Sequence, residues 1–408
     1  MARIVMKFGG TSVADLDRIR HVATRIHAQV DAGHQVAVVV SAMAGATNQL
    51  VSWCQSLSPL HDAREYDTVV ATGEQVTAGL LAIALQALGV EARSFLGWQI
   101  PLATDGAHGT ARIQKIDKQA LIHAMERGRV PVIAGFQGIG PDRRVTTLGR
   151  GGSDTSAVAI AAAIGADRCD IYTDVDGVYT TDPRIVPKAR RLEKIAYEEM
   201  LELASVGAKV LQTRSVELAM KERVRVQVLS SFEADGPDAG TLLVDEDEIV
   251  EKEVVTGIAY SRDEAKVTVK HVPDRPGVAA AVFGPLAAAN VNVDMIVQNV
   301  SDDGTTDMTF TVGVSELARA MASLENDREK IGFTKLITAK DVAKISVVGV
   351  GMRSHAGVAS TMFRTLAEKS INIQVISTSE IKVSVLIAQE YTELAVRALH
   401  TAYGLDAA

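Results

Sequence analysis

The sequence predicts an α/β protein with a mainly parallel sheet, followed by a duplicated βαβ-type module. Three observations predict this fold class. Short β-branched runs alternate with helical patterns over roughly the first 230 residues, which is the order expected of βαβ units. Polar, glycine-rich motifs follow several of these runs, at the position where ligands of parallel sheets bind. The last third of the chain repeats itself with a constant offset of 80 residues.

The elements of the first region can be placed from these patterns in chain order. Five β-branched runs predict buried strands, at residues 4–8, 36–40, 130–134, 169–173 and 224–229. Helical spacing or strong helix formers predict helices at residues 16–30, 69–88, 118–127, 154–164 and 197–221. These elements define a first domain, residues 1–232.

A boundary follows this domain. Residues 233–240 concentrate Asp, Gly and Pro, and residues 245–248 are acidic, so we expect a solvated linker over 233–262. Beyond it, Gly277-Val278-Ala279 recurs as Gly357-Val358-Ala359, and Asn292 recurs as Asn372. Each copy reads as a strand, a glycine turn, a helix and a strand that opens on Asn. The repeat predicts two related modules, residues 263–338 and 339–408.

Composition narrows the class of protein. The chain has 408 residues, 47% of them hydrophobic, which is enough for two or three globular domains. Its net charge of -8 with both signs interspersed argues against nucleic acid as a partner. Two cysteines far apart support neither a disulfide framework nor a zinc site. The N-terminus lacks a signal-peptide core and no apolar run approaches membrane-span length, so we expect a cytoplasmic protein with no membrane partner.

Residues 147–155 carry the most informative motif, Thr-Leu-Gly-Arg-Gly-Gly-Ser-Asp-Thr, which runs directly into an alanine-rich helix. Glycine lets the backbone approach a ligand closely, and a helix N-terminus attracts anions. Arg150 adds a fork of donors suited to a carboxylate or phosphate. The position of Asp154 among these groups suggests that it organises a cation, either a lysine or a metal. The loop has the chemistry of a binding site.

Three further motifs allow two interpretations each. Lys7-Phe8-Gly9-Gly10 follows the first strand and suits phosphate oxygens, but a glycine turn with a surface lysine would look the same. Ser41 and Thr47 follow the second strand, where they could hold a polar substrate or cap a helix. Glu74 begins the most apolar part of a helix, where it could bind the ammonium of an amino acid or simply favour the helix dipole.

Residues 172–184 pack three aspartates, two tyrosines and an arginine into one segment. The Asp-x-Asp-Gly pattern hints at a calcium loop, but the twelfth loop position is Ile185 and not a glutamate. Binding of a nucleotide or a metal-nucleotide complex is the preferred interpretation. Lys209 lies in a later glycine-containing segment and could equally be an ordinary surface residue.

Taken together, the motifs at Lys7–Val13, 149–154 and 172–184 closely resemble those of the aspartokinases, within the amino-acid kinase family. The resemblance covers nearly the whole chain, because the duplicated modules look like tandem ACT domains. It implies an amino-acid-kinase-like sheet sandwiched by helices, followed by two ACT-type modules. It also implies ATP-dependent phosphorylation of the L-aspartate side chain to 4-phospho-L-aspartate, the first step toward lysine, threonine and methionine.

The resemblance also implies roles for individual residues. Lys7 would stabilise the transferring phosphoryl group, and Asp154 would organise the catalytic lysines. Aspartate would be held by Ser41, Thr47, Glu74, Arg150, Gly151, Gly152 and Ser153. ATP would be surrounded by Lys7, Phe8, Gly9, Gly10, Thr173, Asp174, Tyr179, Asp182, Arg184, Lys209 and Val210.

The chemistry agrees with these roles. A carboxylate with a pKa near ~3.9 is already ionised at neutral pH, so the acceptor needs no general base. The reaction needs in-line positioning and cations, because two anions must meet. Mg²⁺ would arrive with ATP, whose phosphate oxygens it prefers, and no resident metal site is expected.

The ACT-type modules imply feedback regulation by lysine, threonine or both, and assembly into a homo-oligomer or an α/β complex. Effector binding would involve Asp274, Gly277, Val278, Ala279, Asn292, Asp294 and Gln298 in the first module. In the second it would involve Val358, Ala359, Asn372, Ile373, Ser379 and Glu380. Because His355-Ala356 replaces Arg275-Pro276, the two copies need not bind the same effector, and one could serve only for dimerisation.

Two other functions remain open at this point. A kinase for glutamate or N-acetylglutamate would share the first domain, although the duplicated tail argues against it. A catalytically inactive amino-acid sensor would use only the modules, although Lys7 and Asp154 are intact.

Overall fold

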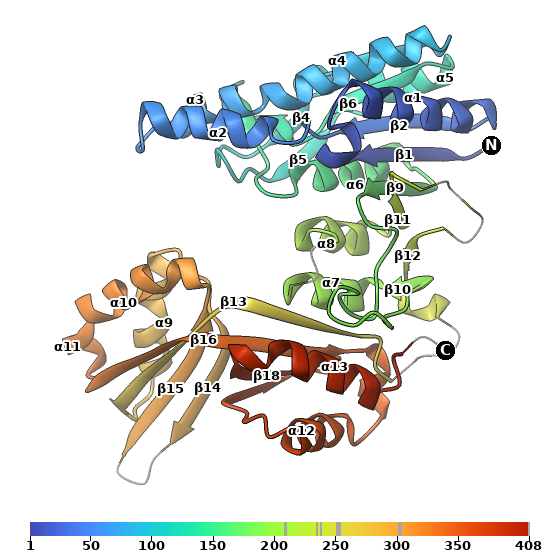
Figure 1. The fold of residues 1–408 in the computed structure, drawn as a ribbon. Helices are drawn as coiled ribbons and strands as arrows, with labels where there is room; N and C mark the ends of the chain where they lie inside the picture. The colour runs from blue at the N-terminus through green and yellow to red at the C-terminus, as the bar shows by residue number, and fades with distance from the viewer. Residues whose placement is uncertain (208–209, 234–235, 237–238, 250–253, 301–303, 407–408) are drawn as a thin grey trace. The chain divides into compact units, whose positions relative to one another are not determined.

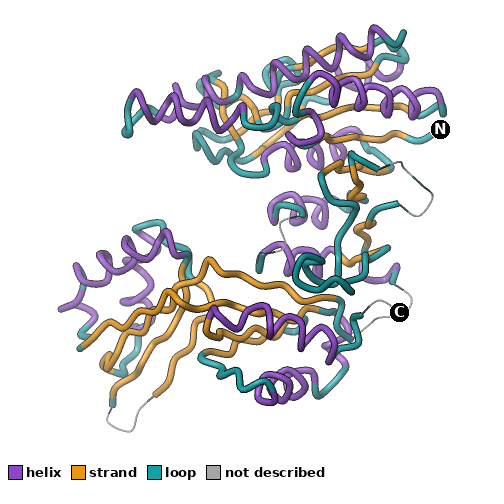
Figure 2. Tube along the Cα trace, in the orientation of Figure 1, coloured by secondary structure: helices purple, strands orange, loops and turns teal. Residues whose placement is uncertain are grey.

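A computed structural model describes residues 1–207, 210–233, 236, 239–249, 254–300 and 304–406. The chain forms two compact units (Figure 1). The first consists of Met1–Val178, Arg191–Ala204 and Lys209–Val250. The second consists of Tyr179–Arg190, Ser205–Ala208 and Glu251–Ala408. The predicted succession of strands and helices is clear when the chain is coloured by secondary structure (Figure 2).

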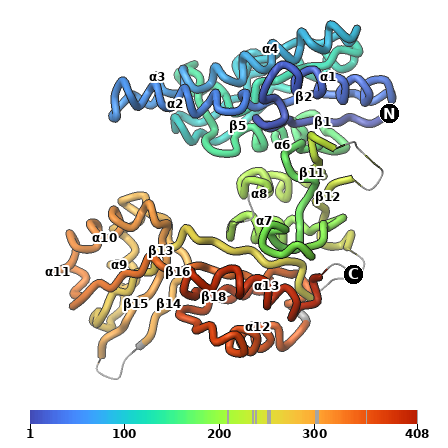
Figure 3. Tube along the Cα trace, viewed as in Figure 1, coloured from blue at the N-terminus to red at the C-terminus, as the bar shows by residue number. Residues whose placement is uncertain are grey.

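The first unit is built on an eight-stranded sheet with the order β10-β12-β11-β9-β1-β2-β6-β3. The strands are β1 (Arg3–Phe8), β2 (Gln35–Val40), β3 (Ala92–Phe95), β6 (Val130–Ala134), β9 (Arg168–Thr173), β10 (Lys194–Ala196), β11 (Val226–Ser230) and β12 (Thr241–Val244). All neighbouring strands are parallel except β11 and β12. The sheet therefore places β1, from the start of the chain, beside strands far away in sequence (Figure 3). The predicted mainly parallel sheet is confirmed.

Helices cover both faces of this sheet. The first unit contains α1 (Leu16–Asp31), α2 (Ala46–Leu57), α3 (Ala63–Val70), α4 (Thr72–Ala87), α5 (Gln119–Glu126), α6 (Gly152–Ile164), α7 (Tyr197–Ser205) and α8 (Thr213–Glu222). Helices α1 and α4 lie on one face and α6 on the other (Figure 1). A smaller sheet has the order β5-β4-β7-β8, from Ile113–Ile116, Leu102–Thr104, Gln137–Ile139 and Val145–Thr147.

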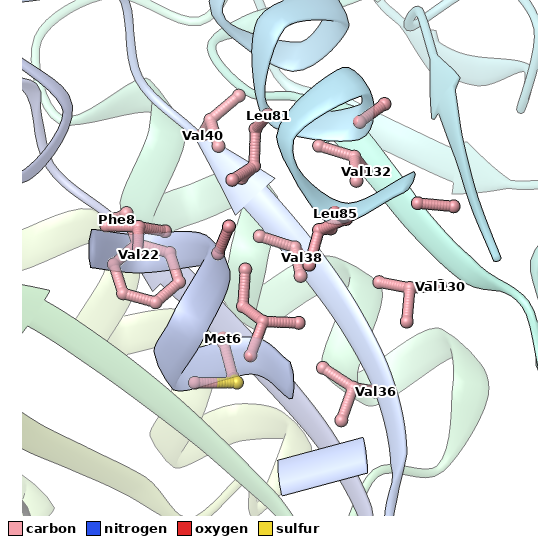
Figure 4. Close-up of a cluster of buried hydrophobic side chains, with 14 of the residues drawn as sticks. Met6, Phe8, Val22, Val36, Val38, Val40, Leu81, Leu85, Val130 and Val132 are labelled. Carbon is pink, nitrogen blue, oxygen red and sulfur yellow. The ribbon is translucent and has the colours of Figure 1, made fainter. Parts of the chain in front are cut away.

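The main core lies between the sheet and the helices α1 and α4. Alternate residues of β1, β2 and β6 point toward the two helices, as their period of two requires (Figure 4). Leu81 and Leu85 of α4 are fully buried against them. Burial of large aliphatic side chains contributes about 1.5–3 kcal/mol each. This core holds the carboxyl ends of β1 and β2 in fixed positions.

Residues Ala63–Ala87, which include α3 and α4, are long enough and apolar enough to cross a membrane, by length and composition alone. They are the only such stretch in the part of the chain that the structure describes. Of the 18-residue apolar stretch within this segment, 44% is buried inside the protein, as expected of a helix that packs on a sheet. A single apolar helix of this length is weak evidence for a membrane-spanning segment, because core helices of globular domains have the same length and composition.

Two predicted helices are wrong in their extent. The helix expected at 197–221 is two helices, α7 and α8, separated by a turn at Val206 and Gly207. Gly207 has a φ of 126°, which a continuing helix cannot accommodate. The helix expected at 69–88 begins only at Thr72, because α3 ends at Val70. The strands β3, β10 and β12, the small sheet and the helices α2 and α3 were not predicted.

The second unit contains a six-stranded sheet with the order β14-β15-β13-β16-β18-β17. Its strands are β13 (Gly257–Pro273), β14 (Asp294–Val300), β15 (Thr305–Val312), β16 (Lys335–Val348), β17 (Val375–Thr378) and β18 (Lys382–Ala388). Its helices are α9 (Val278–Ala288), α10 (Leu317–Asn326), α11 (Arg328–Ile331), α12 (Val358–Glu368) and α13 (Thr392–Ala402). The predicted repeat appears in α9 and α12, which both start after a glycine with positive φ, Gly277 and Gly357.

The two modules share their central strands. Strand β13 pairs with β16 from Gly257 opposite Val348 to Lys270 opposite Lys335. The second half of β13 also pairs with β15, and the second half of β16 pairs with β18. Two separate cores result, one around Val267 and Phe310 and the other around Ile345 and Val385. Residues 257–262, expected to end the linker, are therefore a strand of the second module, and residues 241–244, also expected in the linker, are β12.

Candidate active site

A cavity of about 330 Å³ lies in the first unit, beyond the carboxyl ends of β1 and β2 and at the start of α6. This is the position that parallel sheets offer for ligands. Ten residues predicted for the site line the cavity: Lys7, Gly10, Ser41, Thr47, Glu74, Arg150, Gly151, Gly152, Ser153 and Asp154. The structure therefore brings together side chains from four separate motifs.

Lys7 and Asp154 form an ion pair at the floor of this cavity. The Lys7 Nζ lies 2.5 Å from Asp154 Oδ1, and both residues are buried. Lys7 is the penultimate residue of β1, and Asp154 lies in the first turn of α6, where the helix dipole favours a carboxylate. A buried ammonium held by one carboxylate keeps two donors for a ligand.

The loop that precedes α6 is shaped by two left-handed glycines. Gly149 has a φ of 79° and Gly151 a φ of 69°, a region that other residues rarely adopt. The side chain of Gln212 also covers Gly151 so closely that a Cβ there would lie 1.9 Å from Gln212 Cγ. Arg150, between the glycines, is exposed and lines the cavity.

Buried polar groups hold this loop from behind. The Asp67 carboxylate, fully buried, accepts hydrogen bonds from Thr147 N at 3.1 Å and Thr147 Oγ1 at 2.5 Å. It also pairs with His108 Nδ1 at 2.7 Å. Arg214 donates to the carbonyl of Leu148 at 2.8 Å. Such satisfied buried networks fix the backbone that they bind, so they set where Arg150 can reach.

Glu74 faces the cavity from the first turn of α4. Its Oε1 accepts a hydrogen bond from Ala42 N at 3.1 Å, while Oε2 is buried with no hydrogen-bond partner among the described residues. Burial raises the pKa of Glu74 to about 7. Gly73 allows this placement, because a Cβ there would lie 2.7 Å from Ala42 Cβ. A buried carboxylate with a free oxygen suits an ammonium ligand.

The residues predicted to bind ATP fall into both units. In the first unit, β1 lies beside β9, with Phe8 stacked on Tyr172 and Gly9 N bonded to Tyr172 O at 3.2 Å. Thr173 and Asp174 follow at the end of β9, and Thr173 Oγ1 donates to Asp174 at 3.1 Å. Val210 belongs to the first unit, and Lys209 lies outside the described residues.

Tyr179, Asp182 and Arg184 belong to the second unit. Arg184 Nη2 lies 2.8 Å from the Asp182 carboxylate, and Tyr260 donates to the same carboxylate at 3.2 Å. The hydrogen bond from Arg184 lowers the pKa of Asp182. The Arg184 guanidinium itself remains exposed, so it can meet an anion.

The predicted effector residues lie at the starts of α9 and α12 and along the strands that follow. Most are exposed or half-buried: Asp274, Gly277, Ala279, Asn292, Gln298, Ala359, Asn372, Ile373 and Ser379. Val278 and Val358 are buried in the module cores. Two predicted carboxylates are already paired, Asp294 with Lys344 at 2.7 Å and Glu380 with Arg353 at 3.4 Å. An effector ammonium would have to compete with those cations.

Several functional residues were not predicted. Phe136 lines the cavity, and Asp67, Arg214 and Tyr260 support residues of the site from behind. Asn48, the third polar side chain of the motif that contains Ser41 and Thr47, shares their interpretation as a possible substrate contact and also lines the cavity. Nothing local marks the others, because their partners are distant in sequence. Phe136 also has a φ of 68°, a strained conformation for a bulky residue that is common beside binding sites.

No group of three or more His, Cys, Asp or Glu side chains could hold a metal ion within the described ranges.

The comparisons with known proteins cover the whole chain. Residues 2–230 match the amino acid kinase family, and residues 267–329 and 345–403 each match an ACT domain. The aspartate kinase of Pseudomonas putida is 56% identical over 408 residues, which cover 100% of this chain and 98% of that protein.

Solved structures agree with these matches. E. coli aspartokinase III in complex with aspartate and ADP, in its R-state, is 27% identical with a TM-score of 0.83, over 98% of this chain and 99% of that one. The same enzyme in complex with lysine and aspartate, in its T-state, has a TM-score of 0.76 at 27% identity, with 98% of each chain covered.

Proposed function

This chain belongs to the amino acid kinase family, and on that premise we propose that it is an aspartate kinase that transfers the γ-phosphoryl group of ATP to the side-chain carboxylate of L-aspartate. One observation carries this proposal. A single cavity presents Arg150 for a carboxylate, Glu74 with an unpartnered oxygen for an ammonium, and Lys7 for a phosphoryl group. Those three groups match an amino acid whose second carboxylate receives phosphate.

The reaction follows from these positions. Arg150 and the adjacent glycine N–H groups hold the α-carboxylate, while Glu74 binds the ammonium. The side-chain carboxylate, already ionised, attacks the γ-phosphorus, and the bond to the β-phosphate oxygen breaks to release ADP. Lys7 stabilises the charge on the transferring group, and Asp154 fixes the lysine in place. No residue is needed as a base.

ATP is assigned to the ends of β1 and β9, with Tyr179, Asp182 and Arg184. Mg²⁺ is proposed to arrive with ATP, where it neutralises phosphate charge. The expected location is the cytoplasm. The product is an acyl phosphate, the activated intermediate from which lysine, threonine and methionine are made.

Hydroxylamine trapping tests the substrate. With ATP and Mg²⁺, the protein should yield an acyl-hydroxamate from L-aspartate, because hydroxylamine captures acyl phosphates. Glutamate and N-acetylglutamate, run in parallel, should give signals near the background without amino acid, since N-acetylglutamate has no ammonium for Glu74 and glutamate is one methylene longer than the proposed acceptor. A hydroxamate from glutamate but not from aspartate would overturn the assignment.

The two ACT domains lead us to propose feedback inhibition by lysine, threonine or both. E. coli aspartokinase III has been solved in complex with lysine. We expect millimolar lysine or threonine to lower the initial rate, with alanine as a control that has no effect. Asn292→Ala and Asn372→Ala, at equivalent positions of the repeat, should show which module binds, because one of them should raise the half-inhibitory concentration. Unchanged rates with lysine and threonine together would contradict the proposal.

A further inference from the structure

Three of the residues that we assign to ATP lie in one segment of the second unit. Residues Tyr179–Arg190 belong to the second unit, although the residues on either side, Val178 and Arg191, belong to the first. Its apolar residues Ile185, Val186 and Ala189 belong to the same buried core as α12 and α13 of the second ACT module. The segment is thus packed as part of the regulatory module.

Polar contacts hold the same segment at defined points. The carbonyl of Thr180 accepts a hydrogen bond from Ile258 N at 2.8 Å, and Arg397 of α13 donates to the carbonyl of Ile185 at 3.0 Å. Tyr260 holds Asp182, as described above. Each of these contacts comes from the second module, from either β13 or α13.

His400 makes the most enclosed of these contacts. It lies on α13, is fully buried, and places Nε2 2.9 Å from the Thr180 hydroxyl. Its Nδ1 lies 2.8 Å from the Asp406 carboxylate beyond the helix. Thr180 is fully buried as well, and its hydroxyl accepts from Arg190 N at 3.2 Å, across the base of the segment.

These contacts are consistent with one assignment of protons. Asp406 can only accept, because the hydrogen bond from His400 lowers the pKa of this carboxylate. His400 therefore donates from Nδ1, and in the neutral ring Nε2 accepts a hydrogen bond from the Thr180 hydroxyl. That hydroxyl in turn accepts from Arg190 N. Each hydrogen-bond donor in this series of three hydrogen bonds has an acceptor, so these groups of Thr180 and His400 are satisfied although both residues are buried.

We infer that His400 is a positioning residue for the nucleotide: through Thr180 it holds the Tyr179–Arg190 segment in the conformation that binds ATP. The inference rests on the proposed function, which assigns Tyr179, Asp182 and Arg184 to ATP. Thr180 stands between Tyr179 and Asp182, so a change in its backbone moves both. Loss of the His400 contact would weaken ATP binding and leave the aspartate pocket, formed by other elements, unchanged.

Two substitutions of His400 separate its two hydrogen bonds. An asparagine Nδ2 lies close to where a histidine Nδ1 lies, so His400→Asn keeps the bond to Asp406 and loses that to Thr180. A glutamine Oε1 can replace Nε2, so His400→Gln keeps the acceptor for Thr180. In the full-length protein we expect His400→Asn to raise the KM for ATP about tenfold, as for one lost buried hydrogen bond. His400→Gln should stay within about threefold of the native value.

Three controls complete the experiment. Thr180→Val removes the hydroxyl and with it the contacts to both His400 and Arg190 N, so it should raise the KM for ATP at least as much as His400→Asn. The double variant should be no worse than Thr180→Val alone. Tyr403→Phe removes a different buried hydrogen bond of the same module, to Val358 O at 2.7 Å, and should lower Tm without changing the KM for ATP. The KM for aspartate should be unchanged in all of them.

The outcomes distinguish this inference from the proposed function. A KM for ATP that is unchanged in both His400→Asn and Thr180→Val would overturn the inference, as would equal changes in both KM values. Native protein that binds ADP in calorimetry but phosphorylates no aspartate would instead refute the proposed function. In that case the affinity for ADP of the same variants replaces the KM for ATP as the readout.

Discussion

Lys7→Met is expected to lower kcat by at least about 100-fold, the effect of losing one electrostatic stabiliser of the transition state. The ammonium of Lys7 is buried and Lys7 lines the cavity, where the proposed reaction develops negative charge on the transferring phosphoryl group. Methionine preserves the length of the side chain and removes the charge. Steady-state rates with ATP and aspartate measure the loss, and a rate within a few fold of the native one would refute the role of Lys7.

The same substitution also affects stability, and this effect must be separated from catalysis. Lys7→Met leaves the buried Asp154 carboxylate unpaired, which typically costs about 3–5 kcal/mol of unfolding free energy. The double variant Lys7→Met/Asp154→Asn removes both charges, so it should regain most of that stability. Activity should not return with it. Recovery of Tm without recovery of kcat would show that the loss of rate is chemical and does not reflect unfolding.

The structure brings together residues that the sequence analysis had assigned to one site. Lys7, Glu74, Arg150 and Asp154 were each expected at the site, and all of them line one cavity. Parallel strands explain why these residues lie together, because motifs that follow such strands meet at one edge of the sheet. The alternation of strands and helices was likewise visible in the pattern of apolar residues.

What the sequence could not reveal depends on contacts between distant residues. Asp67 supports the loop at Thr147 from 80 residues away, and nothing near Asp67 marks its partner. The long strand β13 serves two modules, which the repeat could not show, because each copy of the repeat contains only its own helix and edge strands. The separation of Tyr179–Arg190 from its sequence neighbours is of the same kind. Tertiary packing, and not local propensity, decides these features.

Glu74→Gln is expected to raise the KM for aspartate by about 10- to 100-fold, because a hydrogen-bonded contact with a charged group is worth about 1.5–3 kcal/mol. Glutamine keeps an acceptor for Ala42 N, so the pocket should retain its shape.

In the native enzyme the KM for aspartate should also rise as the pH falls below about 7, because protonated Glu74 no longer attracts an ammonium. That pH dependence should disappear in Glu74→Gln. Glu91→Gln, an exposed glutamate paired with Arg129, is the matched control and should change neither.

The same substitution should stabilise the unliganded protein at high pH. Burial raises the pKa of Glu74 from 4.5 to about 7, so the folded state holds this proton more tightly than the unfolded state. Below pH 4.5 both states are protonated and no cost arises. As the pH rises to about 7, ionisation favours the unfolded chain, and above pH 7 it lowers the free energy of unfolding by about 3 kcal/mol.

Glu74→Gln removes this cost, so its Tm should exceed the native Tm at pH 8 and approach it at pH 5. Saturating aspartate should reverse the order at pH 8, since only the native carboxylate gains an ammonium partner. An equal Tm difference between Glu74→Gln and the native protein at both pH values would show that ionised Glu74 does not destabilise the folded protein.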